Sequence, residues 1–349
     1  LAAAVMGAAL AGWGRGPAAK GAAGLALLAG FAAADFVLWG RFLIAPPTVP
    51  MALAAALGFT FASTALHWLY RRKRDFLRHA FAHYAPDGVI RELLRHPDRL
   101  RLGGERRDVT LLFTDIQGFT AMSEAVEGER LVPVLNAYMD RLTDIILAHG
   151  GTIDRMVGDA VIAIFNAPLD VPDHACRAVR AAMAIDDFAR AYSAEIQARG
   201  IPFKLTRIGV NSGPATVGNF GGSQRFQYTA HGDCVNTAAR LETLSKHIGT
   251  TVLVGGATRD ACPEPTLRRV GGFILMGKHE PVDVYEPVAD PERLDAYRPT
   301  EKALHDAGPD ARTTLDAFLE RYPADPVAVF HRQRLERGET GDRVVMGEK

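Results

Sequence analysis

The chain has 349 residues, with 40 basic and 40 acidic side chains and three cysteines. A chain of this length can form about two domains, and its balanced charge gives no reason to expect a nucleic-acid partner. Cys176, Cys234 and Cys262 lack the spacing of a metal site. Their odd number favours reduced thiols in a cytosolic domain.

The first 70 residues are apolar and carry few charges. Residues 21–40 and 50–70 each have the length of a helix that crosses a bilayer, about 20 residues. Residues 1–13 are too short for this, and the chain does not open with Met. We therefore expect residues 1–70 to hold transmembrane helices, the first of them truncated. A signal peptide is the alternative for the first run, but three successive apolar runs argue against it.

Basic residues 71–74 directly follow the last apolar run, which places that end of the run in the cytoplasm. We therefore expect a multi-pass protein of the inner membrane, in contact with lipid, whose remaining chain is cytoplasmic. Asp35 lies within an apolar run and is a candidate functional residue, although it can also reach the interface. Residues 71–104 are expected to form a helical linker that ends at Gly103-Gly104.

The segment from Asp108 to Phe165 contains two strand-like runs, 108–114 and 152–157, and each lies beside an aspartate, Asp115 or Asp159. Between the runs, apolar residues recur at helical spacing: Leu131, Val134, Leu135, Tyr138, Leu142, Ile145 and Ile146. A strand-helix-strand unit of this kind can bring both carboxylates to one sheet edge, where a cation is expected between them. Carboxylate oxygens suit Mg²⁺ or Mn²⁺, so the segment predicts a metal-nucleotide site.

Further elements are predicted in the order helix, strand, glycine-rich hairpin, helix and three short strands: 173–199, 204–211, 213–222, 234–246, 251–254, 272–276 and 282–285. This order favours an α+β fold with one sheet face covered by helices. From Pro287 onward we expect a polar helical tail. In this tail Leu315, Phe318 and Leu319 form an apolar stripe suited to docking.

Three blocks carry a resemblance to a known family: FTDIQGFTAMSE (113–124), DRMVGDAVIAIF (154–165) and VGNFGGSQRFQYTAHGDCVNTAARLE (217–242). In this order they resemble the signature blocks of class III nucleotidyl cyclases. The resemblance implies a ferredoxin-like α+β catalytic domain with an antiparallel-rich sheet at residues 105–286, followed by the tail at 287–349. The apolar runs ahead of it resemble those of bacterial receptor cyclases with an extracellular CHASE-type sensor, which this sequence does not contain.

The resemblance also implies the chemistry of the site. Members of the family convert a nucleoside triphosphate into a 3′,5′-cyclic monophosphate and pyrophosphate, using two metal ions, Mg²⁺ or Mn²⁺. Asp115 and Asp159 match the family's metal ligands, with the carbonyl of Ile116 as a helper. The turn formed by Gly118, Phe119 and Thr120 is expected to present backbone N–H groups to phosphate.

The other half of the family's site comes from a second protomer. Asn236 matches the residue that orients the ribose, and Arg240 matches the residue that stabilises charge at the transferred phosphate. They lie four residues apart on one predicted helix, hence on one face. We therefore expect a homodimer with two equivalent sites.

Base selection is the point at which the sequence departs from the family pattern. Adenylyl cyclases usually have lysine at the position of Arg155 and Asp or Thr at that of Thr229, whereas guanylyl cyclases tend to have Glu and Cys. Because arginine only donates hydrogen bonds, this pair favours ATP. Met276 replaces the family's phosphate-binding lysine, and Lys278, two residues on, is the candidate substitute.

These observations predict an adenylate cyclase that acts in signal transduction. The alternatives are a guanylate cyclase and a catalytically weak nucleotide-binding signalling module.

Overall fold

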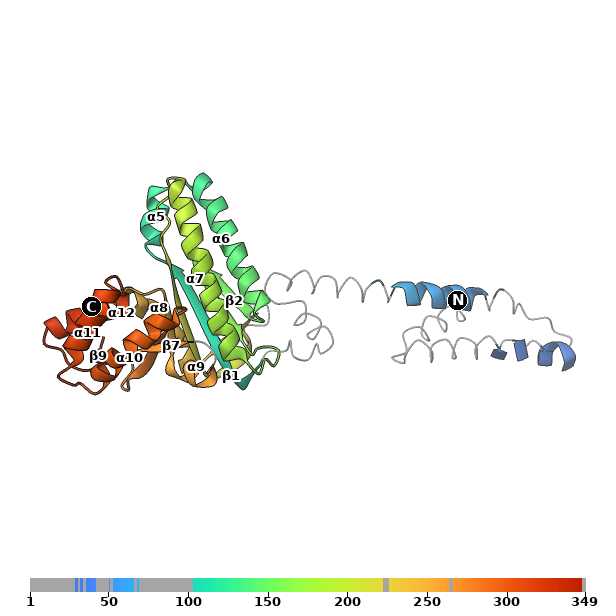
Figure 1. Ribbon diagram of the computed structural model, residues 1–349. Coiled ribbons are helices and arrows are strands. Elements are labelled where there is room, and N and C mark those ends of the chain that lie inside the picture. Colours follow the sequence, from blue (N-terminus) through green and yellow to red (C-terminus); the bar gives the residue numbers. More distant parts are fainter. Residues whose placement is uncertain are drawn as a thin grey trace. The chain divides into compact units, whose positions relative to one another are not determined.

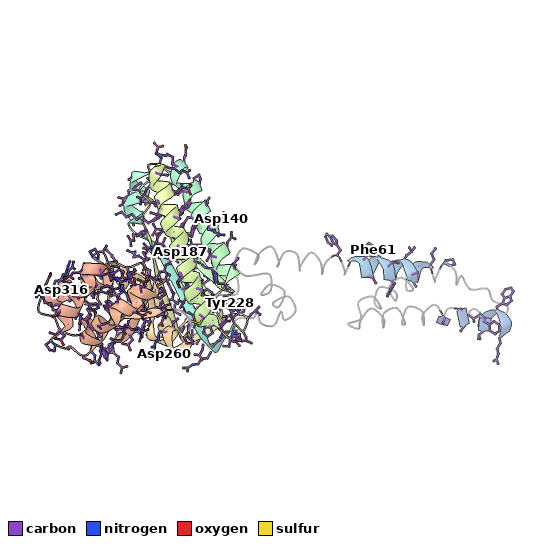
Figure 2. The ribbon with its side chains drawn as sticks, in the orientation of Figure 1. Phe61, Asp140, Asp187, Tyr228, Asp260 and Asp316 are labelled. Atoms are coloured by element: carbon purple, nitrogen blue, oxygen red, sulfur yellow. A yellow bond between two sulfur atoms is a disulfide. The ribbon has the colours of Figure 1, made fainter. Side chains whose placement is uncertain are left out.

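The computed structural model of the chain describes residues 29–30, 32–33, 36–41, 50, 53–65, 68, 103–221, 226–263 and 266–346. The chain divides into two compact units, Leu1–Phe81 and Ala82–Lys349. In the first unit, longer helical stretches are described at 36–41 and 53–65, drawn in blue in Figure 1. Phe61 of this unit is exposed (Figure 2).

Among the described residues, no helix is both long enough and apolar enough to cross a membrane. The expected spans at 21–40 and 50–70 are described only in part. Residues 1–28, Asp35 and the expected linker up to residue 102 lie outside the described residues.

The second unit alternates helices and strands, in the order β1 (Gly103–Ile116), α5 (Phe119–Ala125), α6 (Gly128–Ala148), β2 (Thr152–Val157), β3 (Ala160–Phe165), α7 (His174–Ala198), β4 (Thr206–Gly221), β5 (Phe226–His231), α8 (Asp233–Ile248), β6 (Val252–Gly255), α9 (Gly256–Ala261), β7 (Leu267–Ile274), β8 (Val282–Pro287), α10 (Pro291–His305), α11 (Ala311–Arg321), α12 (Pro326–Glu336) and β9 (Arg343–Val345). Its described strands form one sheet with the order β2-β3-β1-β4-β6-β8-β7-β9, and β5 pairs with β4. The sheet is mixed, because β4 and β6 are parallel, as are β7 and β9. The fold is therefore α+β, as predicted.

Helices cover the sheet on both faces. Helices α6 and α7 lie side by side (Figure 1) and share a core with Leu112 of β1. The neighbouring Leu111 packs instead with Ala238 of α8, because successive strand side chains point to opposite faces. The expectation of one covered face was therefore incomplete.

Helix α8 packs directly on β4 at Gly209. A Cβ atom at this position would lie 2.2 Å from the carbonyl oxygen of Ala238 and 2.4 Å from the backbone nitrogen of Glu242. Only glycine allows the helix this close, so the side of α8 that carries Ala238 and Glu242 faces the sheet.

The sheet contains a strand that was not predicted, and two predicted strand features differ from the structure. Strand β3 was not predicted and lies between β1 and β2 in the sheet. Strand β1 begins at Gly103, earlier than expected, because its first residues pair with the end of β4. The glycine-rich segment 213–222 was wrongly predicted as a hairpin. Through Gly221 it continues β4, held by β1 on one side and by β5 on the other.

The C-terminal segment, which runs from α10 to β9, packs on the sheet and on α8. Leu315, Phe318 and Leu319 of α11 are buried in one core with Leu241 and Leu244 of α8. Their apolar stripe therefore packs against this chain. Strand β9, which was not predicted, extends the sheet beside β7.

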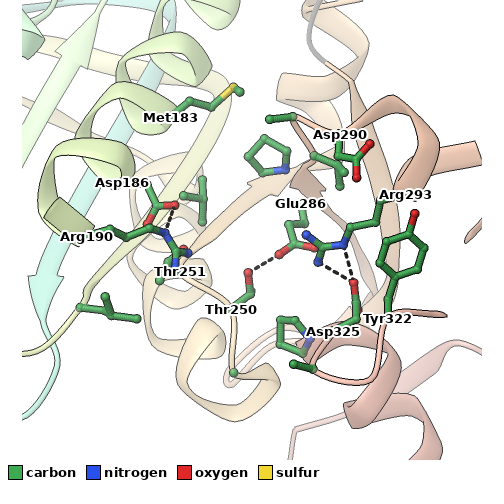
Figure 3. Close-up of a pocket in the computed structure, with 18 of the residues that line it drawn as sticks. Met183, Asp186, Arg190, Thr250, Thr251, Glu286, Asp290, Arg293, Tyr322 and Asp325 are labelled. Carbon is green, nitrogen blue, oxygen red and sulfur yellow. Dashed lines mark hydrogen bonds and ion pairs between the residues drawn. The ribbon is translucent and has the colours of Figure 1, made fainter. Parts of the chain in front are cut away.

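A buried ion network joins this segment to the sheet. Arg268 of β7 is fully buried and donates to Glu286 of β8, with an Nε–Oε2 distance of 2.8 Å, and to Asp325, with an Nη2–Oδ1 distance of 2.9 Å. Arg293 of α10 donates Nε–H to the other oxygen of Asp325 at 2.8 Å, and Thr250 donates to Glu286 (Figure 3). Four of these residues, Thr250, Glu286, Arg293 and Asp325, line a cavity of about 730 Å³ between α7 and the loop that connects α11 to α12.

Cys176 and Cys262 form a disulfide bond, so the prediction of reduced thiols was wrong for this pair. The bond joins the first turn of α7 to the residue after α9, with a Cα–Cα distance of 4.9 Å. Because the two cysteines are 86 residues apart in sequence, their spacing gave no sign of this contact. Cys234 is free and buried.

His331 of α12 makes stability pH-dependent. The ring is fully buried and donates Nε2–H to the carbonyl oxygen of Val270 at 2.7 Å. Burial lowers its pKa from 6.5 to about 4. The neutral ring therefore stabilises the fold above pH 6.5, and this contribution is lost as the pH falls towards 4.

We expect the free energy of unfolding to fall by roughly 2 kcal/mol from this group alone between pH 7 and pH 5. Denaturant unfolding at the two pH values measures the loss, and the His331→Gln variant, which keeps an amide donor but does not titrate, should show a smaller one. Equal losses in both proteins would contradict the assignment to His331.

Candidate functional site

The two predicted metal aspartates meet at the end of β1. Asp115 closes this strand, and Asp159 lies in the turn between β2 and β3. The backbone N–H of Ile116 donates to Oδ2 of Asp159 at 2.8 Å. Burial raises the pKa of Asp159, and the nearby charge of Asp115 raises it further, against the Ile116 hydrogen bond. A cation bound between the carboxylates would relieve this repulsion.

Arg207 is a basic residue of the site that the sequence reasoning missed. It lies opposite Asp115 in the β1–β4 register and donates Nη2–H to its carboxylate. Its Nε–H donates to Oε1 of Glu242 in α8 at 2.6 Å. A charged residue in the otherwise apolar start of β4, TRIGV, was the available signal. Arg207 thus compensates the charge of Asp115.

The donor set fits a divalent cation in part. Among the described residues, no group of three or more His, Cys, Asp or Glu side chains could hold a metal ion. Two carboxylates suit Mg²⁺, which commonly binds through one or two carboxylates together with substrate phosphates. Asp115, Asp159 and the Ile116 carbonyl therefore fit metal ions that arrive with a nucleotide.

The expected phosphate turn lies at the start of helix α5. Gly118 has a left-handed conformation, with φ of 69°, and precedes helix α5, which begins at Phe119 and Thr120. A Cβ atom at Gly118 would lie 3.6 Å from Nζ of Lys204. Lys204 therefore places a cation beside this turn that the sequence reasoning did not anticipate.

Asn236 and Arg240 lie on the side of α8 opposite to Ala238 and Glu242, because they are offset from these by two residues along a helix. Asn236 is exposed, and Arg240 is half-buried beside Gly277. These side chains therefore point away from the sheet face that the Arg207–Glu242 pair occupies. Among the described residues, no hydrogen bond or ion pair joins Asn236 or Arg240 to Asp115 or Asp159.

The structure does bring Arg155 and Thr229 together. Arg155 of β2 donates Nη2–H to Oγ1 of Thr229 in β5 at 2.8 Å. Thr229 is buried, whereas the Arg155 side chain keeps 39% of its surface exposed. The partly exposed guanidinium therefore keeps N–H groups that can donate to a ligand.

Lys278 is occupied by another partner. Its Nζ lies 2.6 Å from Oδ2 of Asp233, at the start of α8, while Met276 is exposed. Contact of Lys278 with phosphate would therefore compete with this ion pair.

Comparison with known proteins identifies the family. Residues 104–282 match the adenylate and guanylate cyclase catalytic domain. The chain therefore belongs to this family of nucleotidyl cyclases. The match includes every residue of the candidate site described above.

Two curated relatives are adenylate cyclase 1 of Rhizobium meliloti (strain 1021) and the adenylate cyclase of Anabaena cylindrica. The first is 37% identical over 224 residues, covering 64% of this chain and 34% of that protein. The second is 35% identical over 185 residues, covering 52% of this chain and 36% of that protein. This chain thus spans about a third of the length of either relative.

A solved structure with the same fold is the adenylyl cyclase CyaB from P. aeruginosa. It is 35% identical, with a TM-score of 0.51, and the match covers 54% of this chain and 97% of that one.

Proposed function

We propose that the protein is an adenylate cyclase that converts ATP into 3′,5′-cyclic AMP and pyrophosphate at the interface of a homodimer. The observation that carries the proposal is the meeting of Asp115 and Asp159 at the end of β1, where Ile116 N–H binds Asp159. The relatives named above as adenylate cyclases support it.

Each half of the proposed site has its own task. Asp115, Asp159 and the Ile116 carbonyl would hold two Mg²⁺ or Mn²⁺ ions, which supply activation of the ribose 3′-hydroxyl and neutralise phosphate charge. Backbone N–H groups of the Gly118 turn bind the phosphates. From the second protomer, Asn236 orients the ribose, and Arg240 stabilises charge that develops at the transferred phosphate.

The Arg155–Thr229 pair supports ATP as the substrate. Arg155 donates to acceptor nitrogens of adenine and has no acceptor for the ring N–H of guanine. The Thr229 hydroxyl accepts from Arg155 and keeps a second lone pair, which can accept from the amino group of adenine. This arrangement favours ATP over GTP.

The test is cyclic nucleotide formation by the purified 349-residue chain, with ATP and GTP in parallel and with Mg²⁺ or Mn²⁺. We expect cyclic AMP in excess of cyclic GMP and of the Asp115→Ala background. A larger yield of cyclic GMP would make the protein a guanylate cyclase. A dimer that binds nucleotide without turnover would be a signalling module, which the Lys278–Asp233 pair and exposed Met276 favour.

We also propose that residues 1–70 anchor the chain in the inner membrane, with the catalytic domain in the cytoplasm and a sensory partner domain controlling it. The support is the apolar sequence of this region, together with its exposed Phe36 and Phe61. Recovery of the chain in the membrane fraction after a carbonate wash is the expected result. Recovery in the supernatant would contradict the anchor.

A further inference from the structure

Strand β2 contains an extra residue immediately before Arg155. In its pairing with β3, Ile153 lies opposite Ala163 and Arg155 opposite Ile162, so Asp154 has no partner of its own. Such a β-bulge breaks the alternation of side chains along a strand and re-aims the residues beside it. As a result, two neighbouring side chains, those of Asp154 and Arg155, contact each other.

The Asp154 carboxylate holds one edge of the Arg155 guanidinium. Its Oδ2 accepts Nε–H of Arg155 at 3.0 Å. The Asp154 side chain is only 3% exposed, whereas that of Arg155 is 39% exposed. The carboxylate is therefore buried, whereas part of the guanidinium that it binds is exposed to solvent.

Gln227 of β5 also binds the bulge residue Asp154. Its Nε2–H donates to the main-chain carbonyl of Asp154 at 2.8 Å and lies 3.4 Å from Oδ1 of the same residue. Gln227 and Thr229 are two apart on β5, so they share one face of that strand. The strand that supplies the Thr229 acceptor for Arg155 thus also supplies the amide that holds Asp154.

We propose that Asp154 and Gln227 are positioning residues for base selection, which fix the direction of Arg155 and thereby its preference for adenine. This inference rests on the proposed function. With Nε–H given to Asp154 and one Nη2–H to Thr229, the remaining N–H groups of Arg155 keep one orientation. A lysine ammonium has no separate N–H edge that Asp154 could bind while the rest of the group contacts Thr229. The proposed role of Asp154 therefore depends on the arginine that this chain has in place of the family's lysine.

The test compares Asp154→Asn with wild type in the full chain, using ATP and GTP. We expect kcat/KM for ATP to fall by about tenfold, mainly through KM, and the ATP:GTP ratio to fall with it. The matched control is Asp260→Asn, since Asp260 also pairs with a neighbouring arginine, Arg259, but on exposed α9. The control should leave both quantities unchanged.

Asp154→Asn is also made in a protein that carries Arg155→Lys, which separates a positioning role of Asp154 from a merely structural one. If Asp154 acts through the guanidinium, Asp154→Asn should cost less than about twofold in this background, because the two changes are coupled. An undiminished loss there, or an unchanged ATP:GTP ratio in the single variant, would overturn the proposal. Gln227→Ala removes the amide but no buried charge, and it should also lower the ATP:GTP ratio. This variant replaces Asp154→Asn if that protein does not fold.

Wild-type chain that turns over neither nucleotide would refute the proposed function but not this inference. In that case, calorimetric binding of ATP and GTP replaces kinetics. Asp154→Asn should then lower the affinity for ATP relative to GTP, and an unchanged affinity ratio would overturn the inference.

Discussion

Replacing Asp115 by Ala is expected to lower the rate of cyclic nucleotide formation by about 10²- to 10⁴-fold. The substitution removes one of two carboxylates at the end of β1 and leaves Arg207 bound to Glu242 alone. Initial rates at saturating ATP and metal measure the effect. The control is Asp140→Ala, an exposed carboxylate on α6 (Figure 2), which should retain the wild-type rate. Near-normal turnover by Asp115→Ala would refute its assignment as a metal ligand.

The same variant tests the shared site. An Asp115→Ala chain keeps Arg240, and an Arg240→Ala chain keeps Asp115, so a mixed dimer contains one intact site. Random pairing of equal amounts makes half of the dimers mixed, and about a quarter of wild-type activity is expected. Two affinity tags can show that mixed dimers have formed. If they form without activity, the two halves of the site do not come from different chains.

The second large effect is on stability. Arg268→Met is expected to lower the free energy of unfolding by about 3 to 5 kcal/mol, because it leaves Glu286 buried without its cation and removes one of two arginines from Asp325. Urea unfolding followed by circular dichroism measures the loss.

The matched control for this change is Arg259→Met, which breaks an exposed pair with Asp260. It should change stability by no more than about 0.5 kcal/mol. If Arg268→Met were as stable as this control, the buried network would not be what holds the C-terminal segment to the sheet.

Local patterns predicted the elements whose own residues carry the signal. The apolar spacing between Leu131 and Ile146 predicted α6, because one face of that helix is buried against the sheet. Thr152–Val157 was likewise predicted as a strand and is β2. The strand-end pattern and the motif resemblance both led to Asp115 and Asp159, which the structure places together.

Features set by distant contacts were not predictable in this way. Glycines in 213–221 indicated a turn, yet pairing with β1 and β5 holds them extended. The Cys176–Cys262 bond depends on how α7 meets α9. The role of Asp154 depends on one extra residue in the register between β2 and β3, which shifts no apolar pattern in the sequence. In the first two cases, a determining partner lies far along the chain.

The core that α8 shares with the C-terminal segment has a consequence for synthesis of the protein. The residues of this core extend along the chain from Leu241 on α8 to Val344 on β9. At ribosomal rates of about 5 to 20 residues per second, the apolar side of α8 waits roughly 5 to 20 seconds before its last covering strand is made. A recombinant fragment cut after β8 would lack α10, α11, α12 and β9, and the part of this core that they cover would be exposed to solvent. Expression of the catalytic domain should therefore extend through β9 to avoid aggregation.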